Sequence, residues 1–308
     1  MVRGTDTLVE SHVGTRKLFS VGDAVYTWND VVERARVTGL WAALEQDARA
    51  GNAALAKASP DEEDVEAAAR AFRYERGLLS GDELDAWLDA RGLTRETWED
   101  YLRRSLAREE LHAAEPGSDG DVTAEAWVEG ICSGTLEALA RELASLVAVA
   151  PSAAAEQLDE EFAAFCRAAA TEAAIAREVE SNRLQWLRVR YAAAAFADPD
   201  VAAEVALCVR TDGEPLAEVA AQAGAETEER LDWLDTVDPE LASRFFTAEP
   251  DEVVGPVPVG EQLVVAHVRA KTAPDEGNPD VRDRAAAALA ERAVSREVNE
   301  RVAWLEPL

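Results

Sequence analysis

The stretch DEVVGPVPVGEQLVVAHVRAK, residues 251–271, decides the fold class of a chain whose other segments mostly have helical patterns. In this stretch the dipeptide Gly255-Pro256 separates two β-branched runs, and Gly260 precedes the apolar segment 262–269. Glycine and proline between β-branched runs are typical of hairpin turns. We therefore expect turns at Gly255-Pro256 and at Gly260, with residues 262–269 as the returning strand.

Alternation along that returning strand predicts its two faces. Because successive side chains of a strand point to opposite sides, Leu263, Val265 and His267 should share one face. Val264 and Ala266 should share the other.

Further elements upstream complete a small α+β unit over residues 201–274. Residues 201–210, VAAEVALCVR, are a short apolar run between turn signals, which favours a buried strand. One helix should end at Gly224, and another should begin at Asp238-Pro239. The expected order is therefore strand, helix, helix and hairpin.

The chain before residue 200 has helical patterns throughout, apart from one hairpin. Residues 16–27, RKLFSVGDAVYT, alternate and turn at Gly22-Asp23, and Thr27 then caps a helix. Three short helices follow, and because none is stable alone they should pack as a bundle. The expected helical segments are 30–46, three that begin with capping residues at Ser59, Ser80 and Thr94, and three longer ones at 123–149, 152–169 and 171–196.

The end of the chain returns to a helical pattern. We expect a boundary loop at 115–121, an Ala-rich helix over 279–298 and a short strand in the closing VAWLEP. The predicted fold class is α+β and predominantly helical. Its expected domains are 1–200, with 275–308 packing back onto it, and 201–274.

The net charge of −30 over 308 residues argues against two classes of partner. Nucleic acid and anionic membrane surfaces would both repel such a chain, whereas a basic client such as an Arg-rich peptide would not be repelled. The opening MVRGTDTLVESHVGTRK lacks the apolar core of a signal peptide, and no window is apolar enough for a membrane span. We expect a cytoplasmic protein.

Residues that bind metals or cofactors show no suitable spacing. Three histidines and three cysteines are scattered along the chain, and there is no phosphate-binding or dinucleotide-binding motif. Cys132, Cys166 and Cys208 are odd in number and cannot form a disulfide framework. We expect neither a metal nor a cofactor.

Residues 238–268, DPELASRFFTAEPDEVVGPVPVGEQLVVAHV, are similar to the second half of parvulin-type peptidyl-prolyl isomerase domains. There a helix after proline, an acidic turn, a GPV hairpin and a last core strand follow in that order. On this resemblance, residues 201–210 would be the first parvulin strand.

The N-terminal part resembles a second family pattern. LFSVGDAVYTWNDVV, residues 18–32, together with the bundle resembles the helical domain of SurA- and PrsA-like chaperones. In those proteins the last helix and strand return to the N-terminal domain. Residues 71–94, AFRYERGLLSGDELDAWLDARGLT, also resemble parvulin-related proteins of peptide-maturation systems.

The chain departs from the polar residues that active parvulins share. Those enzymes resemble one another in a histidine on the first strand, a histidine on the last strand, a cysteine or aspartate between them, and a pocket with methionine and phenylalanine. Residues 201–210 contain no histidine, Gln262 or Leu263 stands where the last-strand histidine is expected, and His267 lies too far along. A gapless match back from the GPV motif puts Val237 and Leu241 at the methionine and phenylalanine positions. The resemblance therefore implies no catalytic residue.

What the resemblance implies instead is a surface that holds an extended peptide. The candidate peptide-binding residues are Val237, Leu241, Phe245, Phe246, Gln262 and Leu263. The expected function is non-catalytic handling of a peptide or unfolded chain, as chaperone or escort, with maturation of a ribosomally made peptide as a further implication. Two alternatives remain open. They are an active prolyl isomerase with atypical residues, and a structural adaptor that holds a biosynthetic enzyme partner.

Overall fold

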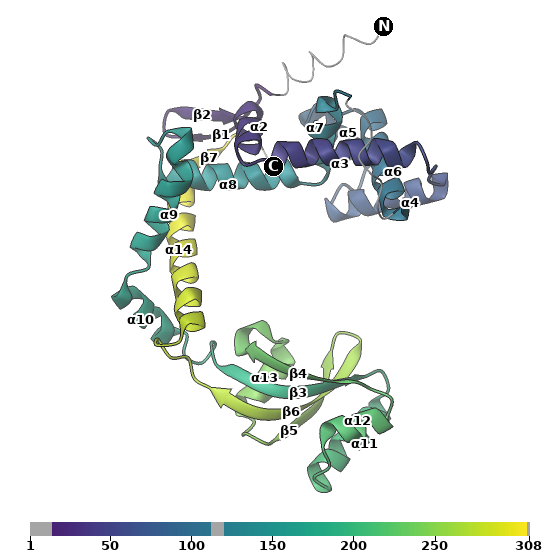
Figure 1. Cartoon of the computed structure of the whole chain (residues 1–308), viewed down its shortest axis with the longest axis vertical. Coiled ribbons are helices and arrows are strands. Elements are labelled where there is room, and N and C mark those ends of the chain that lie inside the picture. Colours follow the sequence, from purple (N-terminus) through teal and green to yellow (C-terminus); the bar gives the residue numbers. More distant parts are fainter. Residues whose placement is uncertain (1–13, 112–119, 307–308) are drawn as a thin grey trace. The chain divides into compact units, whose positions relative to one another are not determined.

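The computed structural model describes residues 14–111 and 120–306 of the chain. It divides into two compact units, one made of residues 1–163 with 294–308 and the other of residues 164–293 (Figure 1). The fold is α+β and predominantly helical, as predicted, with two small antiparallel sheets. None of the helices in the described ranges combines the length and apolar character that a bilayer span requires.

The division of the chain differs from the expected domains. The expected boundaries at 200/201 and 274/275 both lie inside the unit 164–293, because that unit also takes in a strand and parts of helices that precede and follow the expected domain. The loop expected at 115–121 lies outside the described residues except for its last two positions.

The first unit, as far as it is described, consists of helices around a small sheet. Its elements are β1 (Lys17–Val21), β2 (Ala24–Thr27), α2 (Trp28–Val37), α3 (Leu40–Leu55), α4 (Glu62–Glu75), α5 (Gly81–Ala90), α6 (Arg95–Leu111), α7 (Thr123–Cys132), α8 (Thr135–Val149), the 3-10 helix η1 (Ala155–Gln157), the start of α9 (Leu158–Ala169), the end of α14 (Pro279–Arg301) and β7 (Val302–Trp304).

The sheet of this unit joins both ends of the chain. Its strand order is β2-β1-β7, and β7 pairs antiparallel with β1 through Phe19 opposite Trp304. The two rings lie 5.2 Å apart between centroids. The predicted hairpin at 16–27 and the predicted return of a closing strand to the N-terminal part are both confirmed.

Glycine divides two segments that the apolar pattern predicted as single helices. Residues 30–46 fall into α2 and α3 at Gly39, and residues 123–149 fall into α7 and α8 at Gly134. The φ angles are 78° and 77°, in the left-handed region that strains any residue with a Cβ. Because the apolar pattern continues across both glycines, periodicity alone did not reveal the breaks.

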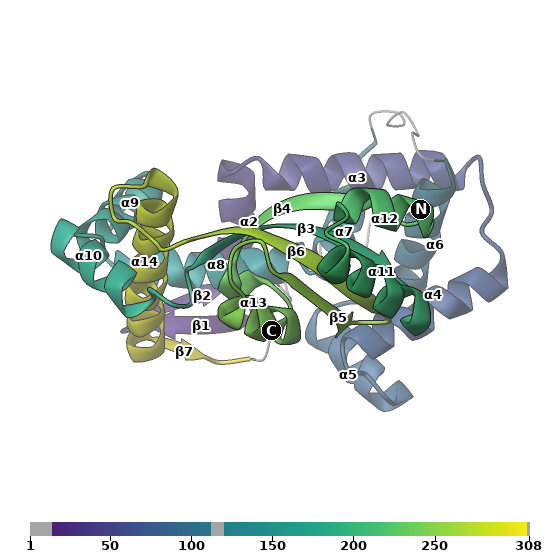
Figure 2. The same cartoon turned by 90° about the horizontal axis from the view of Figure 1, so that it is seen from below.

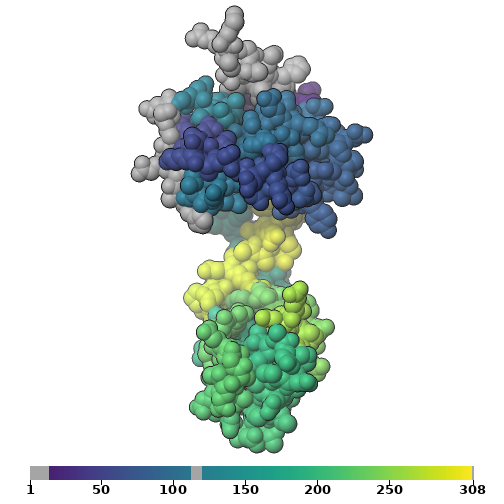
Figure 3. Space-filling view, turned by 90° about the vertical axis from the view of Figure 1, so that its right-hand side faces the viewer, coloured from purple at the N-terminus to yellow at the C-terminus, as the bar shows by residue number. Residues whose placement is uncertain are grey.

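The three-helix bundle forms, but one of its predicted caps does not. At the start of α5 the Ser80 backbone N–H donates to Glu83 Oε2 over 2.7 Å, and the Glu83 N–H donates to Ser80 Oγ, as the capping box requires. The box expected at Ser59 is absent, since Asp61 is the residue before α4 and its side chain accepts no capping bond. Helices α3 to α6, in blue, form one continuous surface (Figure 3).

The second unit is a four-stranded sheet with helices on both faces. Its elements are the end of α9, α10 (Glu172–Ser181), β3 (Arg188–Phe196), α11 (Pro199–Thr211), α12 (Leu216–Gln222), β4 (Thr227–Trp233), the 3-10 helix η2 (Leu234–Thr236), α13 (Pro239–Thr247), β5 (Val253–Val259), β6 (Gln262–Thr272) and most of α14.

The predicted first strand, residues 201–210, is wrong, because this segment lies in helix α11. The side chain of Asp198 accepts a hydrogen bond from the Asp200 N–H over 2.8 Å, and proline occupies the first helical turn. The first strand is β3, which lies at the end of the segment 171–196 that was predicted to be helical. Alanine-rich β3 has little strand propensity of its own. It is a strand because β4 and β6 hydrogen-bond to it on both sides.

The sheet of the second unit has the strand order β4-β3-β6-β5 (Figure 2). Helices α11 and α12 cover one face and α13 covers the other (Figure 1). Val265 packs with α11 and α12, whereas Ala266 and Val268 pack on the α13 side. The predicted alternation along β6 is therefore confirmed.

Gly255-Pro256 forms a bulge instead of the predicted turn. Strand β5 continues through both residues, and its register against β6 shifts between Val254 and Val257. In a regular strand, residues three positions apart point to opposite faces. The shift instead places both Val254 and Val257 in the core on the α13 side of the sheet. The turn predicted at Gly260 is confirmed, since it joins β5 to β6.

Helix α11 binds the backbone of this bulge. The guanidinium of Arg210 donates to the carbonyl oxygen of Val253 over 3.2 Å and also to the carbonyl oxygen of Gly255. Gly255 has a φ of 111°, and a Cβ at this position would collide with the carbonyl oxygen of Val264. The close approach of two strands therefore requires glycine here.

Candidate functional site

A pocket with a volume of about 440 Å³ opens on the α13 face of the second unit's sheet. All its lining residues belong to this unit. They come from all four strands of the sheet and from the segment that carries α13. The lining residues are Tyr191, Ala193, Ala194 and Ala195 of β3, Glu228, Arg230 and Asp232 of β4 with the preceding Glu226, Thr236, Val237, Asp238 and Leu241 around α13, Val259 of β5, and Gln262 and Val264 of β6.

One side of the pocket is apolar. Leu241 of α13 is buried, and Val237, Val259 and Val264 are partly buried in the same core. Asp238 caps α13 by accepting from the N–H groups of the next turn, so the helix begins beside the pocket. These branched side chains give a surface on which an apolar residue of a ligand could be desolvated.

The other side is polar and comes from β4. The phenol of Tyr191 donates to Asp232 Oδ2 over 2.8 Å, and Arg230 Nε donates to Glu228 Oε2 over 2.9 Å. Burial, and next the bond to Asp232, raise the pKa of Tyr191 to about 12. Tyr191 is therefore a neutral donor whose proton is already engaged.

No imidazole reaches this pocket from the described residues. The side chains of β3 that point toward the pocket are Tyr191, Ala193 and Ala195. His267 of β6 points to the opposite face of the sheet, the face on which Val265 packs. His12 and His112 lie outside the described residues. The predicted lack of a histidine on the first strand thus also applies to β3, although that strand was placed wrongly.

His267 lies in a half-buried position among charged neighbours. Its Nε2 is 3.9 Å from Asp251 Oδ1 and 3.4 Å from Arg269 Nη1. Burial, followed by the Arg269 charge, lowers the pKa of this imidazole, and Asp251 opposes the shift. It is a neutral side chain of the sheet at neutral pH.

The structure brings together three of the six predicted peptide-binding residues. Val237, Leu241 and Gln262 line the pocket. Leu263 packs with the core on the opposite face of the sheet. Phe245 is fully buried against Tyr191, with 4.5 Å between ring centroids, and Phe246 is 49% exposed outside the pocket.

Sequence reasoning missed the β3 and β4 side of the pocket. Tyr191, Glu228, Arg230 and Asp232 were not candidates, because β3 was predicted as helix and β4 was not predicted at all. The turn signals Asp198-Pro199 could have separated strand from helix at this point.

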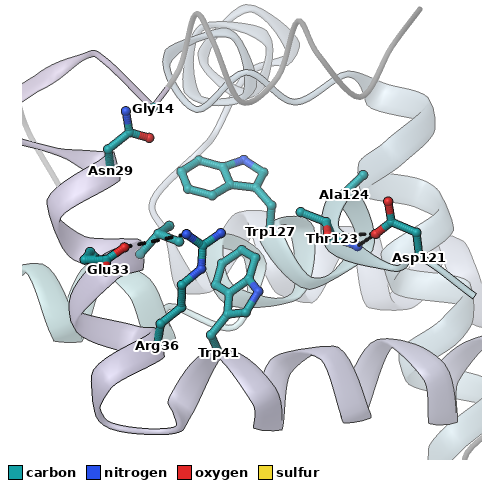
Figure 4. Close-up of a pocket in the computed structure, with 10 residues that line it drawn as sticks. Gly14, Asn29, Glu33, Arg36, Trp41, Asp121, Thr123, Ala124 and Trp127 are labelled. Atoms are coloured by element: carbon teal, nitrogen blue, oxygen red, sulfur yellow. Dashed lines mark hydrogen bonds and ion pairs between the residues drawn. The ribbon is translucent and has the colours of Figure 1, made fainter. Parts of the chain in front are cut away.

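A second pocket, of about 380 Å³, lies in the first unit between α2, α3 and α7 (Figure 4). Arg36 lies over the ring of Trp41 at 5.7 Å and pairs with Glu33 at 3.6 Å. Trp127 forms another wall, and its Nε1 donates to the carbonyl oxygen of Arg91 over 3.3 Å. Glu33 is paired with Arg36, and Asp121 accepts a hydrogen bond from the Thr123 hydroxyl, so the charged groups that line this pocket are already engaged. This arrangement does not indicate a reaction.

Metal-binding and thiol groups show no site among the described residues. No group of three His, Cys, Asp or Glu side chains there could hold a metal ion. Cys132 is buried, and this burial raises the pKa of its thiol to about 12, which makes it a poor nucleophile.

Comparison with known proteins gives only distant structural matches. No protein-family model matches the chain, and no curated protein matches it. Among solved structures it is similar to the foldase protein PrsA from Streptococcus pneumoniae str. Canada MDR_19A, with 14% identity, 92% of this chain and 88% of that chain covered, and a TM-score of 0.29. It is similar to PrsA from Bacillus subtilis at 13% identity, with 93% and 91% covered and a TM-score of 0.26. It is also similar to a structure from Campylobacter jejuni described as one of two SurA-like chaperones, at 8% identity, with 95% and 100% covered and a TM-score of 0.20. Values this low assign no function to the chain.

Proposed function

We propose that the pocket on the second unit binds an extended segment of a peptide or unfolded chain without catalysing its isomerisation, so that the protein acts as a chaperone or escort. The observation that carries this proposal is the pocket itself, in which an apolar wall around Leu241 faces the open strand β4. An apolar client side chain would lose its water shell against the wall while the client backbone remains extended.

The polar groups in the pocket support binding more than turnover. Rotation about an X-Pro bond crosses a barrier of about 18–20 kcal/mol, and catalysis requires groups that stabilise the twisted amide more than the planar one. Tyr191 already donates its proton to Asp232, and Arg230 is paired with Glu228. Gln262 has an exposed side chain with no hydrogen bond inside the described part of the chain, so its amide is not held in one orientation as a preorganised donor would be.

The setting we propose is the cytoplasm, with maturation of a ribosomally made peptide as the process. The resemblance of residues 71–94 to parvulin-related proteins of peptide-maturation systems motivates this setting. A biosynthetic enzyme would then be a second partner, and the client would pass from this chain to that enzyme.

Binding and turnover can be measured on the same protein. A fluorescent, reduced and carboxymethylated protein serves as the unfolded client in anisotropy titrations, and a protease-coupled assay on Xaa-Pro peptides measures isomerisation. Ala193→Phe puts a ring into the pocket from the middle of β3. Leu207→Ala is the matched control, because Leu207 is an exposed apolar residue of α11, the helix on the opposite face.

We expect binding by the native chain and by Leu207→Ala, weakened binding by Ala193→Phe, and no turnover above the uncatalysed rate. Turnover that Ala193→Phe abolishes would identify a prolyl isomerase instead. Absence of any affinity for unfolded chains, combined with stable co-purification of an enzyme, would favour the adaptor.

A further inference from the structure

The two edges of the second unit's sheet differ in whether another strand can pair with them. Strand β5 forms one edge, and within it Pro256 and Pro258 have no backbone N–H to donate. The bulge at Gly255-Pro256 also interrupts its register. Proline and bulges are two of the devices by which proteins prevent pairing at an edge strand, so β5 is closed to a partner.

Strand β4 forms the other edge and lacks these devices. It has no proline, and its register with β3 is continuous from Thr227 to Trp233. Residues 228–231 are exposed, and no other strand of the described residues pairs with its outer side. The open edge also borders the pocket, since Glu228, Arg230 and Asp232 line it.

The charges along this edge determine what could pair there. Glu226 makes no side-chain hydrogen bond or ion pair with the described residues, Glu228 is paired with Arg230 on the surface, and Glu229 is 4.0 Å from Arg269. Asp232 and Asp238 add two carboxylates at the pocket. The edge and pocket thus hold five carboxylates against two guanidinium groups, in a chain with a net charge of −30.

We infer that the client segment is cationic and binds as an added strand along the outer edge of β4, with an apolar residue in the pocket and Lys or Arg side chains beside Glu226, Glu228 and Glu229. This inference rests on the proposed function and specifies the client's chemistry. A second copy of β4 would add three more carboxylates and one guanidinium to an edge that is already acidic, whereas a cationic strand meets opposite charges.

Three glutamates provide the test of charge. We compare the native chain with the triple variant Glu226→Gln, Glu228→Gln and Glu229→Gln. The matched control is Glu204→Gln, Glu214→Gln and Glu218→Gln, which removes the same charge from exposed positions on and between α11 and α12. The probes are two nine-residue peptides with identical apolar residues, one with three arginines and one with three citrullines in their place.

We expect the arginine peptide to bind more tightly than the citrulline peptide, and the β4 variant to lose about threefold to thirtyfold of that affinity at low salt. The control variant should lose less than about twofold of that affinity, because its three glutamates lie away from β4 and the salt screens their attraction for the peptide. Raising the salt concentration should remove most of the difference between the two peptides. Equal affinity for both peptides, with the unfolded client still bound, would overturn the inference and leave the proposed function intact; absence of all binding would overturn both.

A backbone test separates strand addition from charge attraction. In an added strand only every second N–H points toward β4. We therefore compare two arginine peptides, one N-methylated at the odd positions and one at the even positions. Methylation should weaken binding of the peptide whose blocked N–H groups point toward β4 and should spare the other. We expect a loss of at least about tenfold for one of the two methylated arginine peptides. Equal effects of both methylation patterns would show that the charges attract the peptide without a strand pairing.

Discussion

Tyr191 and Asp232 join β3 to β4 through a hydrogen bond of 2.8 Å between the phenol and a carboxylate. Asp232 lies opposite Val189, one step along the same face from Tyr191. The bond therefore crosses the strand pair diagonally and fixes the β4 side of the pocket. Its removal should affect stability and pocket geometry together.

Tyr191→Phe should lower the free energy of unfolding by about 1–2 kcal/mol, because Asp232 loses a partner that is a neutral donor. A second consequence concerns alkaline pH. The pKa of Tyr191 is raised to about 12, so between about pH 10 and 12 the tyrosine ionises in the unfolded chain but not in the folded one. Stability should fall as pH rises through that window, and the variant should lose this contribution to the slope. Urea denaturation at several pH values measures both, and an identical slope in the variant would contradict the assignment.

Phe245 and Phe246 are a matched pair for testing the core of the second unit. Phe245 is fully buried against Tyr191, so Phe245→Ala should cost about 3–5 kcal/mol. Phe246 is 49% exposed, and Phe246→Ala should change stability by about 0.5 kcal/mol or less. Hydrogen exchange of the β3 and β6 amides reports on this unit specifically. Equal losses of protection in the two variants would mean that the face of α13 is assigned wrongly.

Gly255 and Gly260 test the requirement for glycine in the hairpin. At Gly255 a Cβ would meet the carbonyl oxygen of Val264, whereas at Gly260 nothing lies within 4 Å. Both have positive φ, so Gly260→Ala measures backbone strain alone, about 1 kcal/mol, and Gly255→Ala measures strain plus collision and should cost about 3 kcal/mol or more. Thermal denaturation by circular dichroism compares them, and equal shifts in Tm would rule out the collision.

His267 should make the second unit less stable in acid. Its pKa is lowered chiefly by burial and next by Arg269. As pH falls below the ordinary histidine range, the unfolded chain takes up a proton that the folded chain still refuses, so stability falls with pH until the folded group is protonated as well. His267→Gln should weaken this dependence. An NMR titration of the ring measures the pKa directly, and a value above the ordinary range would show that Asp251, 3.9 Å away, dominates instead.

The sequence predicted most elements that have a clear local signal. The Thr27 and Ser80 caps, the turn at Gly260 and the alternating faces of β6 all depend on short-range chemistry, and all are present. Gly39 and Gly134 also have a local signal, but the apolar period continued across them and concealed the breaks.

Strand β3 could not be predicted in the same way. Its run of alanines favours a helix in isolation, and it becomes a strand because β4 and β6 hydrogen-bond to it on both sides. Because β3 was missed, the first strand was assigned to the next segment, residues 201–210. An apolar run this short fits a buried strand or a buried helix equally well. The candidate site suffered most from this, because its polar wall lies on β3 and β4, whereas its apolar wall at Val237 and Leu241 came from the better-predicted helix.

The pairing of β7 with β1 has a consequence for the order of events during synthesis. The hairpin of β1 and β2 leaves the ribosome early, but the strand that completes its sheet is Val302–Trp304. Until that segment emerges, β1 has a free edge and Phe19 lacks the Trp304 ring. The second unit, whose strands all come from the intervening chain, can finish folding first. Until Val302–Trp304 is made, the nascent N-terminal part therefore exposes an unpaired strand edge, and such an edge can pair with other extended chains.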